Sequence, residues 1–142
     1  MKKLLSAMAL TALAIGPAQA NDLYRCETGA LPQGEYVVFF ETGKTSIDKK
    51  GMAELKKAAD RAKYMLDVCV VGQADNQGDK EFNKKLAKKR ATAVVAELKR
   101  LGVPGSTLVT LVQGEAFGDL LPKAIDEKKS AQSRRVTVRL MR

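Results

Sequence analysis

The 142-residue chain contains no histidine and only two cysteines, and these shortages remove most of the common site chemistries. Histidine and cysteine are the usual zinc ligands, and a Ser-His-Asp type of triad needs an imidazole. The carboxylates are scattered, and no two of them have a spacing that would by itself bring them together for acid–base work. The sequence therefore predicts neither an enzyme nor a metal or cofactor site.

Long apolar runs are also missing, except for one at the N-terminus. Residues 1–20 begin with the basic "MKK", continue with the apolar "LLSAMALTALAIG" and end in "AQA". This order is typical of a secretory signal peptide cleaved after Ala20, and the apolar run is short for a membrane span. Cys26 follows "DLYR" rather than the small and aliphatic residues of a bacterial lipoprotein site, so no lipid anchor is expected. We expect a soluble, exported chain over residues 21–142.

The two cysteines, Cys26 and Cys69, would then lie in a compartment where disulfides persist. Only one pairing is possible, and closing that loop would add about 4 kcal/mol of stability if the geometry fits. The alternative is that Cys69, inside an apolar run, is buried as a small hydrophobic residue. We favour the disulfide.

Positive charge is in excess, with 25 basic and 16 acidic residues and a formal net charge of +9. Without Lys2 and Lys3 the exported chain keeps 23 basic and 16 acidic residues, a net charge of +7. Such a surface favours a polyanion: nucleic acid, acidic lipid or an acidic cell-wall polymer. Export argues against nucleic acid as the partner.

The hydrophobic pattern predicts strands that alternate with helices. Runs of β-formers predict strands at Glu35–Phe40, Asp67–Gly72, Ser106–Val112 and Arg134–Leu140. Steps of three and four residues predict helices from Asp48 to about Leu66 and from Asp79 to Leu101, and a short, poor one over Leu120–Lys129. The order β-α-β-α-β-(α)-β predicts an α+β or α/β sandwich, with the helices on one face of a small mixed sheet. Residues 21–34 are predicted to be an extended lead-in, and residues 35–142 the domain.

One acid and one arginine stand out in this arrangement. In the second helix the expected apolar stripe contains Phe82, Leu86, Ala93 or Val94, Leu98 and Leu101. Arg90 borders that stripe, so its guanidinium needs an acceptor, and Asp75 is the nearest acid along the chain. The plainer interpretation is a salt bridge that locks the loop to the helix. The other is a site that holds a ligand.

A longer motif surrounds these two residues. The run G-Q-A-D-x-x-G-x-x-x-F-N-x-x-L-A-x-x-R-A, from Gly72 to Ala91, resembles the signature of the OmpA-like peptidoglycan-binding domain family. "FETGKTSI", "QGEAFGD" and "SRRVTVRL" are similar to three further segments of that family, in the same order. The resemblance covers about Glu35 to Leu140. The motif positions that match without a gap are Asp75, Gly78, Phe82, Asn83, Leu86, Arg90 and Ala91.

The resemblance implies a non-catalytic domain that holds the stem peptide of Gram-negative peptidoglycan through meso-diaminopimelate. By analogy Asp75 takes the ammonium of that residue and Arg90 takes its carboxylate. Gly78 would let the loop turn and present its amides, and Asn83 would brace the loop more than it contacts ligand. Ala74 and Ala87 replace a threonine and a serine of the family pattern, and each change removes a hydroxyl that could serve the ligand.

The resemblance further implies a periplasmic protein that tethers an envelope partner to the cell wall, associated with the outer membrane through that partner. An alternative is a subunit of a secretion, conjugation or motility assembly that keeps the fold but has weakened or lost peptidoglycan binding. Under that alternative Asp75 and Arg90 form only a structural bridge. A basic nucleic-acid binder is the least favoured hypothesis.

Overall fold

The computed structural model describes residues 25–26, 32–74, 78–113 and 134–142. The predicted signal peptide, most of the lead-in and the short helix expected over residues 120–129 lie outside these ranges. The described elements are β1 (Gly34–Phe39), α2 (Lys49–Ala62), β2 (Asp67–Gln73), α3 (Lys80–Arg100), the 3-10 helix η1 (Gly105–Thr107), β3 (Leu108–Gln113) and β4 (Arg135–Met141).

The elements lie where the sequence predicts them, with small shifts at their ends. The third strand was predicted from Ser106, but it begins at Leu108 because residues 105–107 form η1. Its Thr107 hydroxyl donates to the Pro104 carbonyl at 2.8 Å, which favours the tight turn over an extended chain. The first strand ends at Phe39 rather than Phe40, although the Phe40 amide still donates to the Arg134 carbonyl at 2.8 Å.

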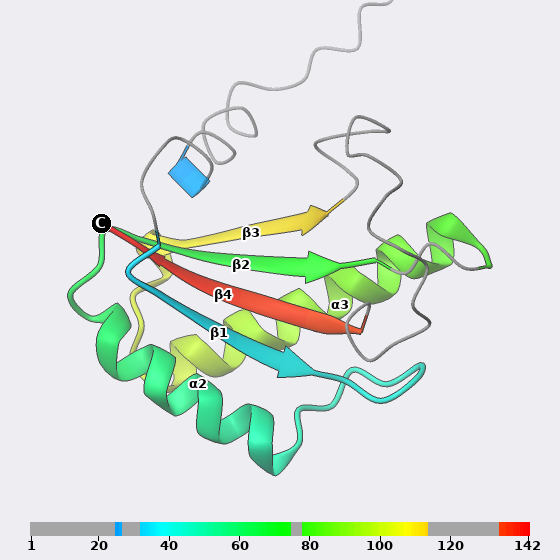
Figure 1. Cartoon of the computed structure of the whole chain (residues 1–142), viewed down its shortest axis with the longest axis horizontal. Helices are drawn as coiled ribbons and strands as arrows, with labels where there is room; N and C mark the ends of the chain where they lie inside the picture. Colours follow the sequence, from blue (N-terminus) through cyan, green and yellow to red (C-terminus); the bar gives the residue numbers. More distant parts are fainter. Residues whose placement is uncertain (1–24, 27–31, 75–77, 114–133) are drawn as a thin grey trace, which may run out of the picture.

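The four strands form one mixed sheet in the order β1-β4-β2-β3 (Figure 1). The C-terminal strand β4 lies between β1 and β2 and is antiparallel to both, whereas β2 and β3 are parallel. Val138 of β4 lies opposite Tyr36 of β1 and opposite Val70 of β2. Because side chains alternate along a strand, this register turns alternate buried residues of all three strands, Val38, Val70 and Val138 among them, to one face.

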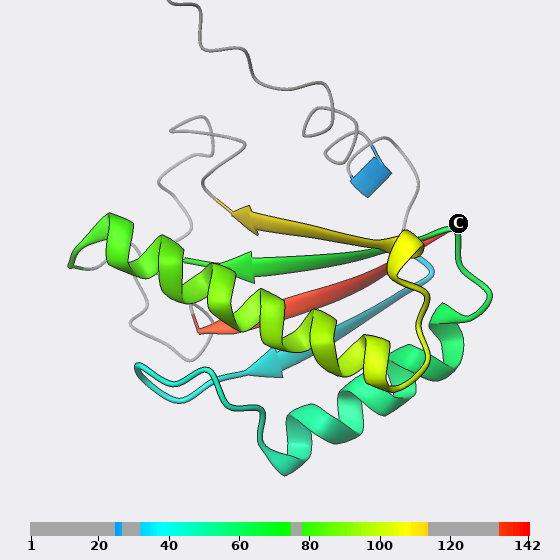
Figure 2. The same cartoon turned by 180° about the vertical axis from the view of Figure 1, so that it is seen from behind.

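Both helices pack on that face, as the view from behind shows (Figure 2). Every second residue of β4 faces this core, and Val136, Val138 and Leu140 are all fully buried. The core between sheet and helices contains these three residues together with Val38, Leu55, Ala58, Val68, Val70, Ala91, Val94 and Leu98. The predicted sandwich, with helices on one face of a small mixed sheet, is therefore the observed fold.

Aspartates begin both helices, and glycine and proline end the second. The Asp48 carboxylate accepts from the Gly51 amide at 2.7 Å, and the Asp79 carboxylate accepts from the Phe82 amide at 3.0 Å. After α3, Gly102 takes a positive φ of 93°, and Pro104 follows two residues later. None of the helices in the described part of the chain combines the length and the apolar character that crossing a bilayer requires.

The apolar stripe predicted for α3 is wrong at its first member. Phe82 is 61% exposed, and the buried residues of the helix are Ala87, Arg90, Ala91, Val94 and Leu98. The buried face therefore runs through small residues and includes a charged one. Small residues allow α3 to lie close to the sheet, which a stripe of phenylalanine and leucine would prevent.

The second face of the sheet holds the disulfide. Cys26 and Cys69 are bonded, with an S–S distance of 2.01 Å and 43 residues between them, so the predicted pairing is confirmed. The bond is buried in a small cluster with Val109 and Met141. Arg25 also forms an ion pair with Asp67, at the start of β2. These contacts fix the described part of the lead-in to β2.

Candidate functional site

Arg90 is the best-defined charged group in the interior. Its side chain projects from the middle of α3 and the residue is only 3% exposed, as its place beside the apolar stripe predicts. The Nε atom donates to the Lys44 carbonyl at 2.9 Å, and one Nη donates to the Glu41 carbonyl at 3.0 Å. These bonds are among its interactions and are not all of them. Two bonds from one fork fix the plane of the guanidinium.

The segment between β1 and α2 supplies both of these carbonyls and an aromatic contact to Arg90. The Phe40 ring lies beneath the guanidinium, with the Arg90 Cζ atom 5.3 Å from the ring centroid. In the same segment the Glu41 carboxylate forms an ion pair with Lys44. The hydrogen bond to Glu41, and after it the negative charge of Glu41, raise the pKa of the Lys44 ammonium above its ordinary value. Arg90 therefore ties the β1–α2 segment to α3.

The close approach of α3 to β2 determines where Arg90 can reach. A Cβ atom on Gly72 would lie 2.6 Å from the Ala87 carbonyl oxygen and 3.3 Å from the Ala91 Cβ atom. Only glycine fits there, because real Cβ atoms do not approach carbonyl oxygens so closely. Gly72 opens the family motif in the sequence, and its role in the structure is to let the helix lie directly against the strand.

Ala87 lies in the same contact between α3 and β2. Ala87 is buried in the interface between α3 and β2 rather than facing the solvent. A serine at this position would place its hydroxyl within the helix–sheet contact. The prediction that this substitution removes a hydroxyl that could serve the ligand stays a prediction. Ala74 is half-buried at the end of β2, and the prediction made for it stays a prediction.

The turn that leads into α3 has the predicted chemistry. Gly78 adopts a φ of +78°, in the left-handed region that glycine favours, and a Cβ atom there would meet nothing within 4 Å. Its constraint is thus the backbone conformation and not the available room. Asn83 is half-buried in the first turn of α3, and its backbone N–H donates to the Asp79 carbonyl at 3.0 Å.

Asp75, the other predicted charge of the site, lies outside the described residues. The structure thus places Arg90, Asn83 and Gly78 along α3 and its leading turn, and it adds Phe40 and the carbonyls of residues 41 and 44. The signal that could have found these additions is the "FETGK" run, whose carbonyls follow a strand end directly. Within the ranges that the structure describes, no group of three or more His, Cys, Asp or Glu side chains could hold a metal ion.

Comparison with known proteins identifies the family of the region that contains these residues. A family model described as the OmpA family matches residues 39–136, which is more than half of the chain. The peptidoglycan-associated lipoprotein of Rhizobium meliloti (strain 1021) is 36% identical over 80 residues, 55% of this chain and 46% of that protein. The chain therefore spans about half the length of this relative.

Solved structures agree on the fold. The crystal structure of the peptidoglycan-associated lipoprotein from Burkholderia pseudomallei is 29% identical, with a TM-score of 0.61 over 73% of this chain and 88% of that one. The OmpA-like domain of FopA1 from Francisella tularensis subsp. tularensis SCHU S4 is 23% identical, with a TM-score of 0.60 over 75% and 70% of the two chains. The C-terminal domain of Helicobacter pylori MotB is 21% identical, with a TM-score of 0.56 over 72% and 81%. At these last two identities the likeness concerns the fold alone.

Proposed function

The chain belongs to the OmpA family, and on that premise we propose that it binds the stem peptide of peptidoglycan through meso-diaminopimelate, without catalysing a reaction. The single observation that supports this most is Arg90, a guanidinium oriented by two backbone carbonyls at the family's arginine position. A relative and a solved structure that are similar to this chain are named peptidoglycan-associated lipoproteins, which supports the choice of polymer.

The chemistry of the ligand matches the charges of the site. The free end of a diaminopimelate side chain carries an ammonium and a carboxylate on one carbon. Such a zwitterion is held best by one fixed charge of each sign, so Asp75 takes the ammonium and Arg90 takes the carboxylate. A guanidinium has five N–H donors in one plane, and the two carbonyl bonds fix that plane. Gly78 sets the conformation of the loop that carries the acid, and Asn83 braces that loop.

Binding without catalysis makes the domain a tether. We propose that residues 1–20 direct export and are removed after Ala20, and that residues 35–142 form the wall-binding domain in the periplasm. The lead-in, residues 21–34, is attached to β2 through Cys26 and binds a protein partner from the envelope. This partner associates the chain with the outer membrane. The disulfide and the Arg25–Asp67 ion pair support this role, because they attach residues 25 and 26 to β2.

One observation favours a second candidate function. Arg90 is only 3% exposed, so a ligand carboxylate can reach it only if the groups that cover the guanidinium move. An arginine with a purely structural role requires no such movement. Under this second function the chain is a subunit of an envelope-spanning assembly that keeps the fold and has lost its hold on the wall. The two functions differ in one measurable respect, which is whether the folded protein binds peptidoglycan.

The test is co-sedimentation of the purified protein with diaminopimelate-type sacculi. Asp75→Asn and Arg90→Lys keep the size or the charge of each group and remove its role, since lysine lacks the planar fork. Asp60→Asn and Arg100→Lys are matched controls, because both residues are exposed and distant from the motif in sequence. All variants are first compared by circular dichroism. The proposal requires that native protein and controls bind and that both folded site variants bind at least about tenfold less, the scale of losing one charged contact. Native protein that stays in the supernatant would support the assembly subunit instead.

A further inference from the structure

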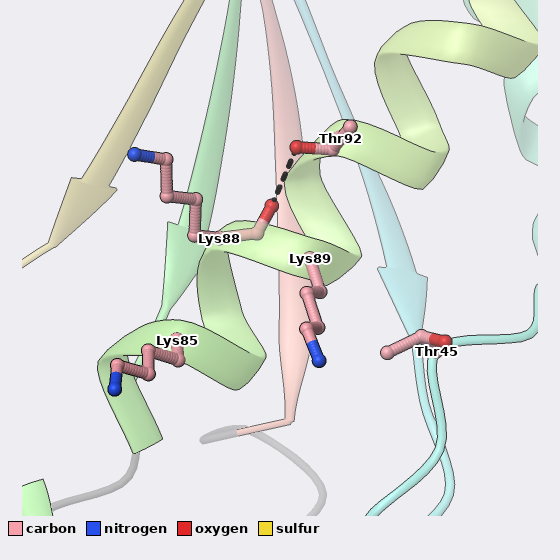
Figure 3. A pocket seen from close by; sticks show the side chains of 5 residues that line it. All are labelled: Thr45, Lys85, Lys88, Lys89 and Thr92. Carbon is pink, nitrogen blue, oxygen red and sulfur yellow. Dashed lines mark hydrogen bonds between the residues drawn. The ribbon is translucent and has the colours of Figure 1, made fainter. Parts of the chain in front are cut away.

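A second group of charges lies next to Arg90 on the outer side of α3. An open hollow of about 460 Å³ is lined by three lysines of this helix, Lys85, Lys88 and Lys89, together with Thr45 and Thr92. Figure 3 shows these five side chains at the cleft between α3 and the β1–α2 segment. The Thr92 hydroxyl donates to the Lys88 carbonyl at 2.9 Å and is thereby fixed in place.

The three lysines are a coherent surface because of helix geometry. Positions three and four residues apart share one side of a helix, so Lys85, Lys88 and Lys89 face outward together. Their neighbour Lys84 is different, since its ammonium pairs with Glu81 at 3.7 Å. Among the described residues no carboxylate lies within ion-pair distance of the three ammonium groups that line the hollow. The surface is therefore one of concentrated and uncompensated positive charge.

The hollow and the proposed diaminopimelate site are connected through two short stretches of chain. Lys89 precedes Arg90 on the helix, and Thr45 follows Lys44, whose carbonyl accepts from Arg90. In Figure 3 the Lys89 side chain lies between α3 and the segment that carries Thr45. A chain molecule held at Arg90 would therefore pass over these lysines when it leaves the site on this side.

We propose that Lys85, Lys88 and Lys89 form a second contact with the same polymer, binding further free carboxylates of the peptidoglycan stem peptides. This inference rests on the proposed function, because it assumes that one stem peptide is held at Arg90. Stem peptides carry free carboxylates on their glutamate residue and at their C-terminal end, spaced along a flexible chain. Ammonium groups are suited to such a ligand, since each one is a mobile point charge without a fixed fork.

The arrangement of the lysines fits a spaced polyanion better than a compact anion. In Figure 3 Lys85 and Lys88 extend away from the side to which Lys89 points, so the three amines do not converge on one position. A single phosphate or sulfate would meet only one of them at close range. The hollow is lined by lysine and threonine side chains and has no large apolar side chain to enter a lipid layer, which disfavours a membrane surface.

The test compares two triple variants that change the net charge equally. Lys85→Gln/Lys88→Gln/Lys89→Gln removes the surface, and Lys49→Gln/Lys50→Gln/Lys56→Gln removes three exposed lysines of α2 as the control. Both proteins are expressed from the full-length sequence, and their binding to diaminopimelate-type sacculi is measured at about 20 mM and about 300 mM NaCl, where screening is weak and strong. The expected result is about a tenfold loss of affinity at low salt for the α3 variant alone, as three exposed ion pairs supply. At high salt this difference should shrink to about twofold or less.

Each other outcome overturns a definite part. If native protein binds sacculi and the α3 variant binds equally well, the lysine contact is wrong while the proposed function stands. If both triple variants lose affinity equally, the effect is one of net charge and the lysine contact is again wrong. If native protein does not bind sacculi, the proposed function fails and this inference fails with it. A loss confined to vesicles of anionic phospholipid, with binding to sacculi unchanged, would assign the surface to a membrane and overturn the inference.

Discussion

Replacing Arg90 with methionine would remove a buried guanidinium and keep most of the volume of its aliphatic part. The change deletes the bonds to the carbonyls of Lys44 and Glu41, at 2.9 and 3.0 Å, and the stacking on Phe40. A hydrogen bond from a charged group contributes about 1.5 kcal/mol at the low end, and an arginine over an aromatic ring adds about 0.5 kcal/mol. We therefore expect Arg90→Met to lower the free energy of unfolding by about 3 kcal/mol.

Arg90→Met also removes the cost of burying the charged guanidinium, and this offsets part of the loss. Replacing a buried ionic group with an apolar one can be neutral when all of its partners are replaced too. Here the two carbonyls remain and both lose the Arg90 donor, and the Glu41 carbonyl keeps its bond from the Lys44 amide at 3.1 Å. That asymmetry makes a net loss the expected result. It also means that any binding experiment on Arg90 variants must include a measurement of folding.

The assay is urea unfolding followed by far-ultraviolet circular dichroism, since the chain contains no tryptophan to report by fluorescence. Arg100→Met is the control, because Arg100 is exposed on the same helix and pairs only with its neighbour Glu97 among the described residues. Arg90→Met should shift the unfolding midpoint clearly, and Arg100→Met should shift it much less, since an exposed ion pair contributes little. Equal midpoints for the two variants would show that the contacts of Arg90 with the β1–α2 segment do not stabilise the fold.

Three further changes test other parts of the structure. Gly72→Ala should lower the free energy of unfolding by about 1–3 kcal/mol, because the new Cβ atom would lie 2.6 Å from the Ala87 carbonyl oxygen. Gly78→Ala should lower it by only about 1 kcal/mol, because Gly78 has a positive φ. Equal losses for the two variants in urea unfolding would contradict this. Replacing both cysteines with alanine should lower stability by about 2–4 kcal/mol relative to the oxidised protein, and an unchanged midpoint would mean that the disulfide does not restrain the unfolded chain. The hydrogen bond from Arg100 lowers the pKa of the Glu97 carboxyl below its ordinary 4.5, so the stability it contributes is present above that value and is lost as the pH falls through the lowered pKa. Glu97→Gln should therefore reduce the loss of unfolding midpoint between about pH 6 and pH 3, and an unchanged loss would count against the pair.

The strands and helices could be predicted because local pattern determines them. Runs of β-formers predicted the strands, and steps of three and four residues predicted the two helices. The order of the strands within the sheet was not predicted, since periodicity does not say which strand lies in the middle. The disulfide followed from counting, because two cysteines in an exported chain allow one pairing.

The carbonyl partners of Arg90 could not be predicted from the pattern around it. They lie 46 and 49 residues away in the chain, and any residue type supplies a carbonyl. The error at Phe82 has a similar cause, because the first turn of α3 continues the helical period of apolar residues but is largely exposed. The burial of Ala87 depends on the close contact of α3 with β2 at Gly72, which the pattern of the helix does not contain. Tertiary approach decides each of these cases, and a single sequence does not contain it.

The most direct test of the central claim needs no mutation. Isothermal titration calorimetry would compare a stem peptide that contains meso-diaminopimelate with the same peptide that contains lysine, which keeps the ammonium and lacks the second carboxylate. The account predicts binding of the diaminopimelate peptide and a loss of at least about tenfold for the lysine peptide, because only the first gives Arg90 a carboxylate to hold. Equal affinity for the two peptides, or no binding of either, would contradict it.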